Sequence, residues 1–425
     1  MSANLISNFL KTKYDKGKVP HQVFEEFPTL ARIPKRSDGG GDYYSASVVI
    51  GNPMGLGPTL AIAQAGATQG SAQQDLKGRK WIIPWGDYSA SVNIEDKDIK
   101  RSRNNEVSFI NWLDEQITGL QRSFLERLSI LVFAETGRYL GTGTISTGVI
   151  TLGNAADVIK FPIGSMIVAS ANDGSSTGHT LLGSGSIGYV FAQDEGAGTV
   201  TVATTAGSTT AGTPASWTGT MYLFANGDFG GSGANTIFPG LGAWLPPAAP
   251  TGGDSFNNVD RSVAPSQLAG FRLLTADVAG LSIRQRITKL VTIMNTRGTT
   301  PGVTDLILNP EKWQMLVDEL QAQGSRVLDG QGFQFNTSSI KFPIGGKVIE
   351  VVSDRHCPIA TCFALTMPKD GSNIVMPSID ELPHVISEDG LQMLRSTTAN
   401  TYEHRLQCYP SFVIKAPGWC GRCPV

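Results

Sequence analysis

The chain has 425 residues, of which 40% are apolar and only 16% are charged, against a charged share of ~25% in typical proteins. With 34 basic and 36 acidic side chains its net charge is −2, which argues against a strongly basic nucleic-acid binder. No apolar run reaches the ~18 residues of a membrane-spanning helix, and the first residues lack the apolar segment of a signal peptide. We therefore expect a cytoplasmic product of about two to four domains that either has a large interior or hides much of its surface against other subunits.

Residues 1–41 have the pattern of an N-terminal arm. Short apolar patches alternate with Lys, Pro and polar residues, and the sequence SDGGG breaks the chain at 37–41. Two β-prone runs with similar text follow, at residues 42–50 and 87–94. They flank a long tip rich in small residues. The pattern predicts an extended hairpin in which these two runs are the strands. The similarity between their amino-acid sequences could equally have arisen by chance.

Residues 104–135 predict a long amphipathic α-helix. Its apolar residues recur at steps of three or four and form one stripe: Ile110, Leu113, Ile117, Leu120, Phe124, Leu128 and Leu131. Charged and amide side chains fill the other faces. Asn104 or Asn105 can cap the start, and Gly137 is expected to stop the helix. At ~1.5 Å per residue the helix would be roughly 45 Å long, so it either braces several parts of the chain or is an ordinary long core helix.

The composition changes sharply after Gly141. Residues 141–250 hold six charged residues and are dominated by Gly, Thr, Ser and Ala. Short β-prone runs recur at 145–152, 166–169, 187–191, 198–203 and 221–224. Regular short strands with Gly-rich turns predict a small all-β barrel or sandwich inserted into the chain, closed by the Pro-rich stretch that ends at Gly253.

The remaining sequence predicts alternating helices and strands. One helix is expected at 282–297, and a second starts at Pro310 after an Asn309 cap and ends at Gly324. Strands are expected at 305–308, 347–352, 361–366 and 411–415, with a turn at 368–371.

Two sequence patterns resemble catalytic motifs but lack the context that the chemistry needs. Residues 183–188 match the dinucleotide fingerprint G-x-G-x-x-G, yet a β-prone run follows where a helix should meet the pyrophosphate, which favours a plain Gly-rich turn. Trp419-Cys420-Gly421-Arg422-Cys423 is similar to a thioredoxin redox motif, but we expect no helix after it, and the first Cys of that motif needs a helix N-terminus. The sequence has no zinc-protease helix or phosphate-binding loop.

All five cysteines fall late in the chain: Cys357, Cys362, Cys408, Cys420 and Cys423. An odd number without a secretion signal argues against a disulfide framework. Cysteines 357, 362, 420 and 423, with His356 and His404 nearby, could supply four zinc ligands, although C-x4-C is a loose spacing. Small buried thiols are favoured, and no catalytic residue, metal or cofactor is predicted.

Four stretches, taken in order, carry a family resemblance. They are residues 31–35; residues 51–55 leading to 61–65; residues 238–246 (FPGLGAWLP) with 258–262 and 268–270; and Asp389-Gly390 with Arg395, Tyr409-Pro410 and Ala416-Pro417-Gly418. Together with the arm, hairpin, long helix, β domain and α/β segments, this order resembles the major capsid protein of tailed bacteriophages. The resemblance spans nearly the whole chain, and it rests on the order of motifs that are individually weak.

The resemblance implies an α+β fold of the Hong Kong ninety-seven type with an inserted all-β domain. It divides the chain into an N-terminal arm (1–41), a hairpin called the E-loop (42–95), a peripheral or P-domain with its spine helix (96–140), the inserted β domain (141–250), a P-domain continuation (251–332), an axial or A-domain (333–400) and a C-terminal strand returning to the core (401–425). It places intersubunit contacts on the E-loop at Leu60, Ile62, Gln64, Lys77, Arg79 and Lys80. It places the spine-helix core at Ile110, Leu113, Ile117, Leu120, Phe124 and Leu128.

The resemblance also implies a structural role. Such a protein is not an enzyme; it self-assembles as hexamers and pentamers into an icosahedral head that encloses double-stranded DNA without sequence-specific binding. Its implied location is the virion capsid, after synthesis in the host cytoplasm. Implied partners are a separate scaffolding protein, a portal protein and a decoration protein, with no membrane. The alternatives are a cytosolic enzyme with a Gly-rich β domain, for which no polar constellation is found, and a β-rich fibre or adhesin, against which the long helix argues.

Overall fold

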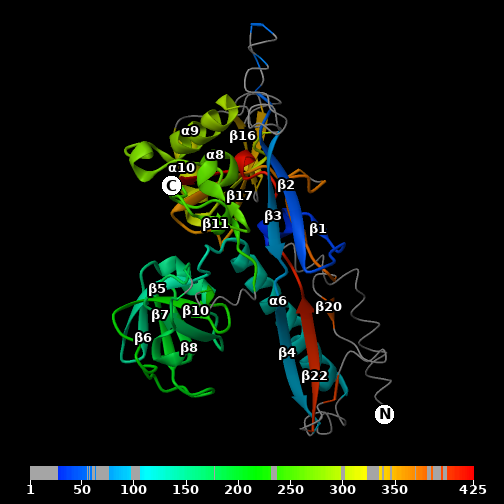
Figure 1. The fold of residues 1–425 in the computed structure, drawn as a ribbon. Helices are drawn as coiled ribbons and strands as arrows, with labels where there is room; N and C mark the ends of the chain where they lie inside the picture. Colours follow the sequence, from blue (N-terminus) through cyan, green and yellow to red (C-terminus); the bar gives the residue numbers. More distant parts are fainter. Residues whose placement is uncertain are drawn as a thin grey trace.

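The structure, a computed structural model, describes residues 27–54, 56, 58–59, 63, 76–96, 106–176, 178–230, 237–297, 302–322, 335–336, 339–344, 347–368, 370–380, 384–385, 394–395 and 400–425. Side chains at 106–116 and at a few helix and strand positions beyond residue 320 lie outside this description. Figure 1 shows an upper body with two parts below it. On one side is a barrel, and on the other side a long helix lies together with two long strands.

The upper body is built on a seven-stranded mixed sheet in the order β13-β24-β18-β14-β17-β16-β15. In chain order its strands are β13 (Phe271–Arg272), β14 (Asp305–Leu308), β15 (Phe335–Asn336), β16 (Ser339–Ile344), β17 (Lys347–Ser353), β18 (Thr361–Leu365) and β24 (Gly421–Pro424). Helices α9 (Ile283–Thr296) and α10 (Pro310–Ala322) share an apolar core with this sheet. The two helices predicted here and the strands predicted at 305–308, 347–352 and 361–366 are therefore confirmed.

Local signals set the starts of these helices. Ser282 and Gln285 form a reciprocal capping box before α9, and the Asn309 side chain accepts from the Glu311 N–H at 3.1 Å before α10. Strand β24, in contrast, was not predicted. It contains Gly421, where an added Cβ would lie 2.8 Å from the Met294 sulfur of α9, so glycine permits the close approach of helix and strand.

The main core joins segments that are far apart in the sequence. Its buried side chains include Leu30 from α3 (Pro28–Arg32), Trp244 from α7 (Leu241–Trp244) and Phe412 from the C-terminal segment. Short strands β1 (Lys35–Arg36), β19 (Ile374–Pro377) and β23 (Val413–Ile414) form a small sheet that contributes to this core. The strand predicted at 411–415 is thus present, but shorter. Elements β11 (Ser255–Phe256), β12 (Val259–Asp260) and α8 (Pro265–Leu268) lead from this core to β13.

The long helix, α6, runs from Glu106 to Val132 and is ~40 Å long. The predicted caps at Asn104 and Asn105 lie outside the described residues. Its end differs from the prediction, because it stops at Val132, five residues before Gly137. The reason is tertiary. The loop before α7 packs directly on the helix end, where a Cβ on Gly240 would lie 2.3 Å from the Leu131 carbonyl oxygen.

The stripe predicted along α6 can be followed over its second half. Ile117, Phe124 and Leu128 are buried and Leu120 is partly buried, whereas the side chains of Ile110 and Leu113 lie outside the described part. The buried surface is wider than one stripe. Gln121, Leu125 and Ser129 are also buried, because the core surrounds this half of the helix on more than one face.

The hairpin pairs differently from the prediction. Strand β2 (Tyr43–Gly51) pairs antiparallel with β3 (Lys77–Pro84), whose first half was assigned to the tip. The second predicted strand, β4 (Tyr88–Glu95), pairs instead with β22 (Thr401–Cys408), which also carries β20 (His384–Val385) and β21 (Leu394–Arg395). Gly86 between β3 and β4 approaches the Pro410 carbonyl so closely that a Cβ would lie 2.8 Å from it. This contact with the C-terminal segment turns the chain away from β2 after β3. The amino-acid sequence of the two similar runs does not contain this information.

The predicted β domain is a closed six-stranded barrel in the order β10-β5-β6-β9-β8-β7. Its strands are β5 (Gly141–Ser146), β6 (Val149–Leu152), β7 (Met166–Ser170), β8 (Gly188–Asp194), β9 (Thr199–Ala203) and β10 (Thr220–Ala225). The run predicted at 145–152 is a tight hairpin, because Thr147 and Gly148 both adopt positive φ, as a two-residue hairpin turn of the primed type requires. The fingerprint-like residues 183–188 form a turn that leads into β8.

Two predicted domain boundaries fall inside structural units. The barrel ends at Ala225, whereas residues 237–245 belong to the main core, so the boundary at 250 lies too far along the chain. The boundary at 332 separates α10 from strands of the same seven-stranded sheet. Both differences have one cause, since each core collects elements that are distant in sequence.

Candidate functional site: the projecting hairpin

The β2–β3 hairpin is anchored to the main core at its base. Trp81 is fully buried, its indole N–H donates to the Lys415 carbonyl at 3.2 Å, and its ring packs edge-on against Trp244 at 5.1 Å between centroids. The Ser411 hydroxyl donates to the Pro84 carbonyl at 2.7 Å. Ile83 is also fully buried. The lower half of the hairpin therefore has a fixed position relative to the body.

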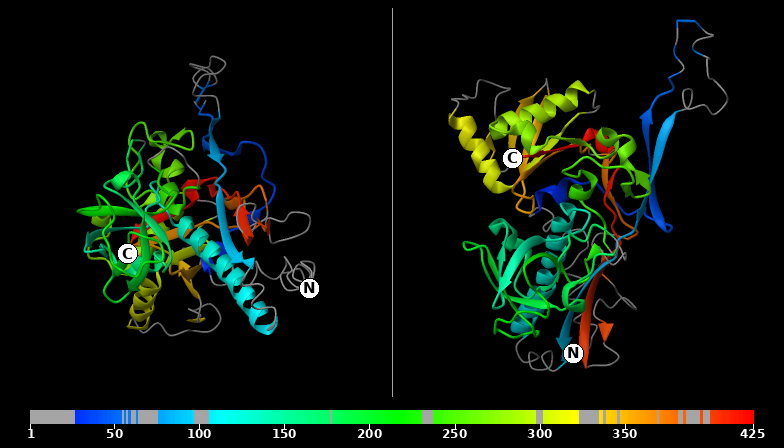
Figure 2. Two further views of the ribbon diagram at one scale, coloured as in Figure 1. Left: turned by 90° about the horizontal axis from the view of Figure 1, so that it is seen from below. Right: turned by 60° about the vertical axis from the view of Figure 1, so that its left-hand side comes forward.

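The outer half of the hairpin leaves the body, as the view on the right of Figure 2 shows. It collects large apolar side chains that remain exposed: Val49 (56%), Met54 (66%), Leu56 (79%) and Leu76 (59%). They are four of the twelve large apolar side chains exposed on the described part of the chain. Single exposed apolar residues need no explanation, but a concentration on one projecting element is typical of a contact surface.

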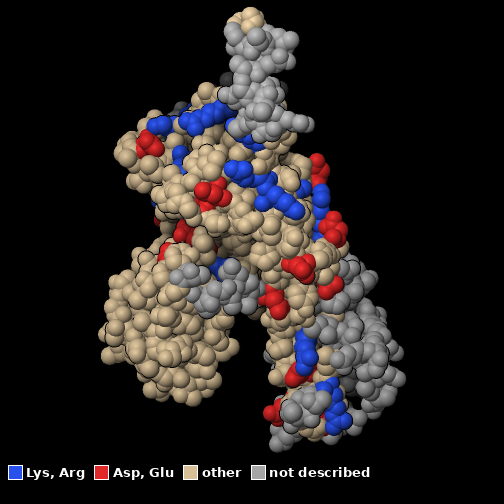
Figure 3. Space-filling view, in the orientation of Figure 1, with Lys and Arg blue, Asp and Glu red and all other residues tan. Residues whose placement is uncertain are grey.

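Basic side chains accompany this apolar surface. Lys77, Arg79 and Lys80 are all exposed on β3, and no ion pair between them and a described carboxylate is present. By contrast, the barrel face turned to the viewer in Figure 3 is almost without charge. The hairpin thus offers both apolar area and positive charge, of which Arg79 lies near enough to Asp260 to interact with it electrostatically.

The strand edges of the hairpin are open. Among the described strands, β2 and β3 pair only with each other. One backbone bond reaches β3 from its other side, from the Ile82 N–H to the Asn257 carbonyl at 3.1 Å, near the base. Open edges with unpaired N–H and C=O groups can accept a further chain.

Of the contact residues predicted from the family resemblance, half can be placed. Lys77, Arg79 and Lys80 lie on the exposed outer half of β3. Leu60, Ile62 and Gln64 lie outside the described residues. The exposed side chains of Val49, Met54, Leu56 and Leu76 were not singled out from the sequence, because their exposure depends on how far the hairpin extends beyond the body.

The residues considered for redox or metal chemistry are packed as structural groups. All five cysteines are buried and unpaired. Burial raises the pKa of Cys420 to about 11 and that of Cys423 to about 12, so neither is a ready thiolate nucleophile. In the described residues no group of three or more His, Cys, Asp or Glu side chains is arranged to hold a metal ion.

Nor does any helix in the part that the structure describes combine the length and apolar character needed to cross a membrane.

Known proteins resemble this chain in structure and not in sequence. No protein-family model matches it, and no curated protein is significantly similar to it. The capsid structure of cyanophage A-1(L) matches with a TM-score of 0.50 at 11% identity, over 92% of this chain and 89% of that chain. The chain has the fold of tailed-phage capsid proteins. The predicted α+β capsid fold is therefore confirmed.

Two further solved structures match with lower TM-scores. The encapsulin of Synechococcus elongatus matches with a TM-score of 0.42 at 10% identity, over 93% of this chain and 86% of that one. The capsid of the myovirus XM1 matches with a TM-score of 0.41 at 9% identity, over 93% and 90%. In this chain the capsid fold carries its barrel between α6 and α7.

Proposed function

We propose that this chain is the major capsid protein of a tailed phage, a structural protein and not an enzyme. It would assemble as hexamers and pentamers into an icosahedral head that encloses double-stranded DNA. One observation carries the proposal beyond the fold: the outer half of an anchored hairpin exposes a concentration of apolar and basic side chains with open strand edges. A second copy of the chain is the proposed occupant of this surface.

In this proposal the structural units have distinct roles. The β2–β3 hairpin is the E-loop, α6 is the spine of the P-domain, the α/β body supplies the A-domain, and the barrel is an insertion domain. A scaffolding protein, a portal protein and a decoration protein are the proposed partners. Synthesis takes place in the host cytoplasm, and the mature location is the virion. A net charge of −2 suits a shell that encloses DNA without gripping it tightly.

The energetics favour a weak contact that is repeated many times. Fully burying a large apolar side chain contributes about 1.5–3 kcal/mol relative to leaving it exposed. Val49, Met54 and Leu76 are each more than half exposed, so covering them would yield roughly half to two-thirds of that amount per residue. A neighbour that also pairs with a strand edge would add backbone hydrogen bonds. The free energy of each such contact is small. In a closed shell the total is large, because the hairpin of every subunit contacts one neighbour and every subunit is contacted by the hairpin of another.

The test compares two pairs of substitutions of the same kind. Val49→Asp with Leu76→Asp places charges on the hairpin, and Ile163→Asp with Met166→Asp places them on equally exposed positions of the barrel. The hairpin variant should remain folded, with a melting temperature near that of the parent, because neither side chain is buried. It should fail to form megadalton particles in sedimentation and electron microscopy, whereas the barrel variant should form them.

Several outcomes would contradict the proposal. Normal shells from the hairpin variant would show that this surface does not hold subunits together. A parent protein that forms only small oligomers would favour an enzyme, and an elongated trimer would favour a fibre. Particles produced in the native host without nuclease-protected DNA would exclude a phage head.

A further inference from the structure

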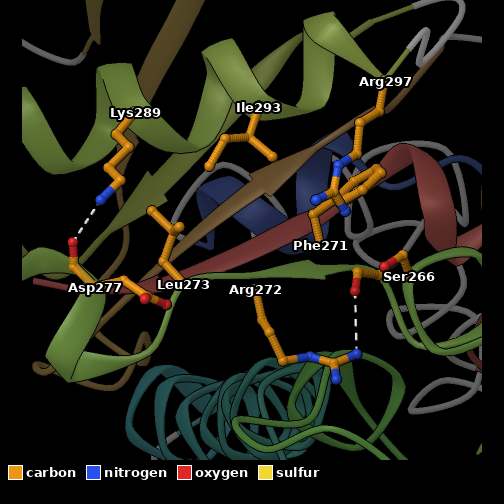
Figure 4. Close-up of a pocket in the computed structure, with 9 residues that line it drawn as sticks. Ser266, Phe271, Arg272, Leu273, Asp277, Lys289, Ile293 and Arg297 are labelled. Atoms are coloured by element: carbon orange, nitrogen blue, oxygen red, sulfur yellow. Dashed lines mark hydrogen bonds between the residues drawn. The ribbon is translucent and has the colours of Figure 1, made fainter.

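A cleft of about 260 Å³ lies at the opposite end of the upper body's sheet from β15, along strand β13. It is lined by Ser266, Gly270, Phe271, Arg272, Leu273, Asp277, Lys289, Ile293 and Arg297. Figure 4 shows Lys289, Ile293 and Arg297 coming from α9 and Phe271, Arg272 and Leu273 from the strand below it. A single water needs only roughly 10–15 Å³ of such volume, so the cleft has room for side chains.

The strand that borders the cleft has an open edge. In the described part of the chain β13 pairs only with β24. The N–H groups of Phe271 and Leu273 donate to the Cys420 and Arg422 carbonyls at 3.0 and 3.1 Å. Because successive peptide groups of a strand face opposite edges, the N–H and C=O of Arg272 between them face outward. An extended chain laid along this edge would find backbone partners there.

The cleft carries excess positive charge. It is lined by three cations and one carboxylate, Asp277, one oxygen of which accepts from the Leu274 N–H at 2.9 Å. Lys289 donates to a backbone carbonyl at 2.6 Å, and Arg297 lies 5.3 Å from the centre of the Phe271 ring, so neither contact neutralises a charge. No described carboxylate forms an ion pair with any of the three cations.

Arg272 is held by the backbone but keeps one buried donor without a partner among the described residues. Its guanidinium donates to three backbone carbonyls, of Pro265, Ala269 and Gly270, and its buried Nε has no hydrogen-bond partner among the described residues. Burial lowers the pKa of Arg272 from its ordinary value, and the neighbouring Arg261 lowers it further. A negative group nearby would relieve both effects.

The charges are spread along the cleft and do not converge on one point. Lys289 and Arg297 are separated by about two turns of α9, and Figure 4 shows the Arg272 side chain pointing away from that helix. This spacing does not fit a single small anion. Apolar walls at Phe271, Leu273 and Ile293 lie between the cations, and Leu274 (49% exposed) continues the apolar surface beyond the cleft.

We propose that this cleft, named here the β13 cleft, binds an extended peptide segment of another protein that carries two acidic residues four positions apart with an apolar residue midway between them. The open strand edge would set its direction, the two carboxylates would pair with Lys289 and Arg297, and the apolar residue would lie against the walls at Ile293, Phe271 and Leu273. This spacing fits one side of an extended chain, because every second side chain points to the same side and four residues span roughly the two helical turns between Lys289 and Arg297. This surface is separate from the hairpin, and the proposal does not depend on shell formation.

The test is a titration of purified full-length protein with a fluorescent seven-residue peptide that has Glu at its second and sixth positions, Leu at its fourth and Ser elsewhere, blocked at both ends. Anisotropy should show saturable binding, and the same peptide with Lys in place of the acids should not bind. Lys289→Gln and Arg297→Gln should each weaken binding about threefold, as for partly exposed charge pairs, and together about tenfold. Lys312→Gln with Lys341→Gln, which removes the same charge elsewhere on the body, should leave binding unchanged.

Arg272 is left intact in this design because its guanidinium holds the backbone around it. Melting curves confirm that the variants are folded. Absence of binding at millimolar peptide, or equal binding by the Lys289→Gln/Arg297→Gln variant and the parent, would overturn the proposal. A single-stranded oligonucleotide that binds the parent in place of the peptide, and is lost in the same variant, would also overturn it in favour of a nucleic-acid surface.

Discussion

Replacing Trp81 with Ala should detach the projecting hairpin from the body without unfolding the rest. Trp81 is fully buried and loses three things on truncation: its volume in the core, its hydrogen bond to the Lys415 carbonyl, and its edge-on contact with Trp244. Truncation of a buried Trp to Ala costs about 3–5 kcal/mol. The outer half of the hairpin has few other anchors, so this cost should fall on local opening.

Limited proteolysis with trypsin measures that opening, because Lys77, Arg79 and Lys80 are cleavage sites on β3. When opening and closing are fast, the cleavage rate follows the population of the open state. A loss of about 3 kcal/mol or more should therefore accelerate cleavage at these sites by at least ~100-fold, since every 1.4 kcal/mol is tenfold. The main thermal transition should shift much less than the cleavage rate.

Two matched variants sharpen the result. Trp81→Phe keeps a ring but loses the N–H donor, a change of about 1 kcal/mol, so cleavage should rise roughly fivefold. Ser47→Ala on β2 changes an exposed position of the same hairpin and should stay within about 0.5 kcal/mol of the parent. Cleavage of Trp81→Ala within about twofold of the parent would refute the view that Trp81 anchors the hairpin.

Two further predictions concern the barrel anchor and the buried thiols. Arg127 of α6 pairs with Asp228 just after the barrel, and both side chains are nearly buried, so Arg127→Met or Asp228→Asn alone should cost about 3–5 kcal/mol in chemical denaturation. The Arg127→Met/Asp228→Asn double variant should recover most of that cost, and strictly additive losses would show that the pair is not coupled. For the thiols, burial raises the folded-state pKa of Cys420 to about 11 and of Cys423 to about 12, above the ~8.5 of an unfolded thiol. The stabilisation is complete below the unfolded-state pKa and is lost as the pH rises above it. The free energy of unfolding should therefore fall less steeply with pH, between about pH 8 and 10, in a Cys420→Ala/Cys423→Ala variant than in the parent. Identical slopes in the two proteins would contradict this.

Much of the local structure follows from the sequence. The apolar period at 104–135 predicts α6, and capping signals at Ser282 and Asn309 place the starts of α9 and α10. The change in composition after Gly141 predicts the barrel, because short β-prone runs with Gly-rich turns can close on one another without distant partners. The order of weak motifs is enough to predict the capsid fold that the structural comparison confirms.

The candidate site is predicted less completely. Lys77, Arg79 and Lys80 were expected at the hairpin, but its strand pairing was wrong and its exposed apolar residues were not identified. Whether Val49 is buried or exposed depends on what lies beside it, and no local pattern contains that information. The same holds for the β13 cleft, whose cations come from a strand and a helix that meet only in the folded chain.

The sequence by itself determined most of the segments that become helix, strand and barrel, because periodicity, caps and turn residues act over a few neighbouring positions. Tertiary structure alone decided where α6 ends, which strand β4 joins, and that residues 421–424 become an inner strand of a sheet. Each of these features depends on contacts between residues that are a hundred or more positions apart in the sequence. The contacts are Gly240 with the end of α6, β22 with β4, and Gly421 with Met294. Such contacts are selected by the complementary shape of the whole core, which exists only once the distant segments have come together.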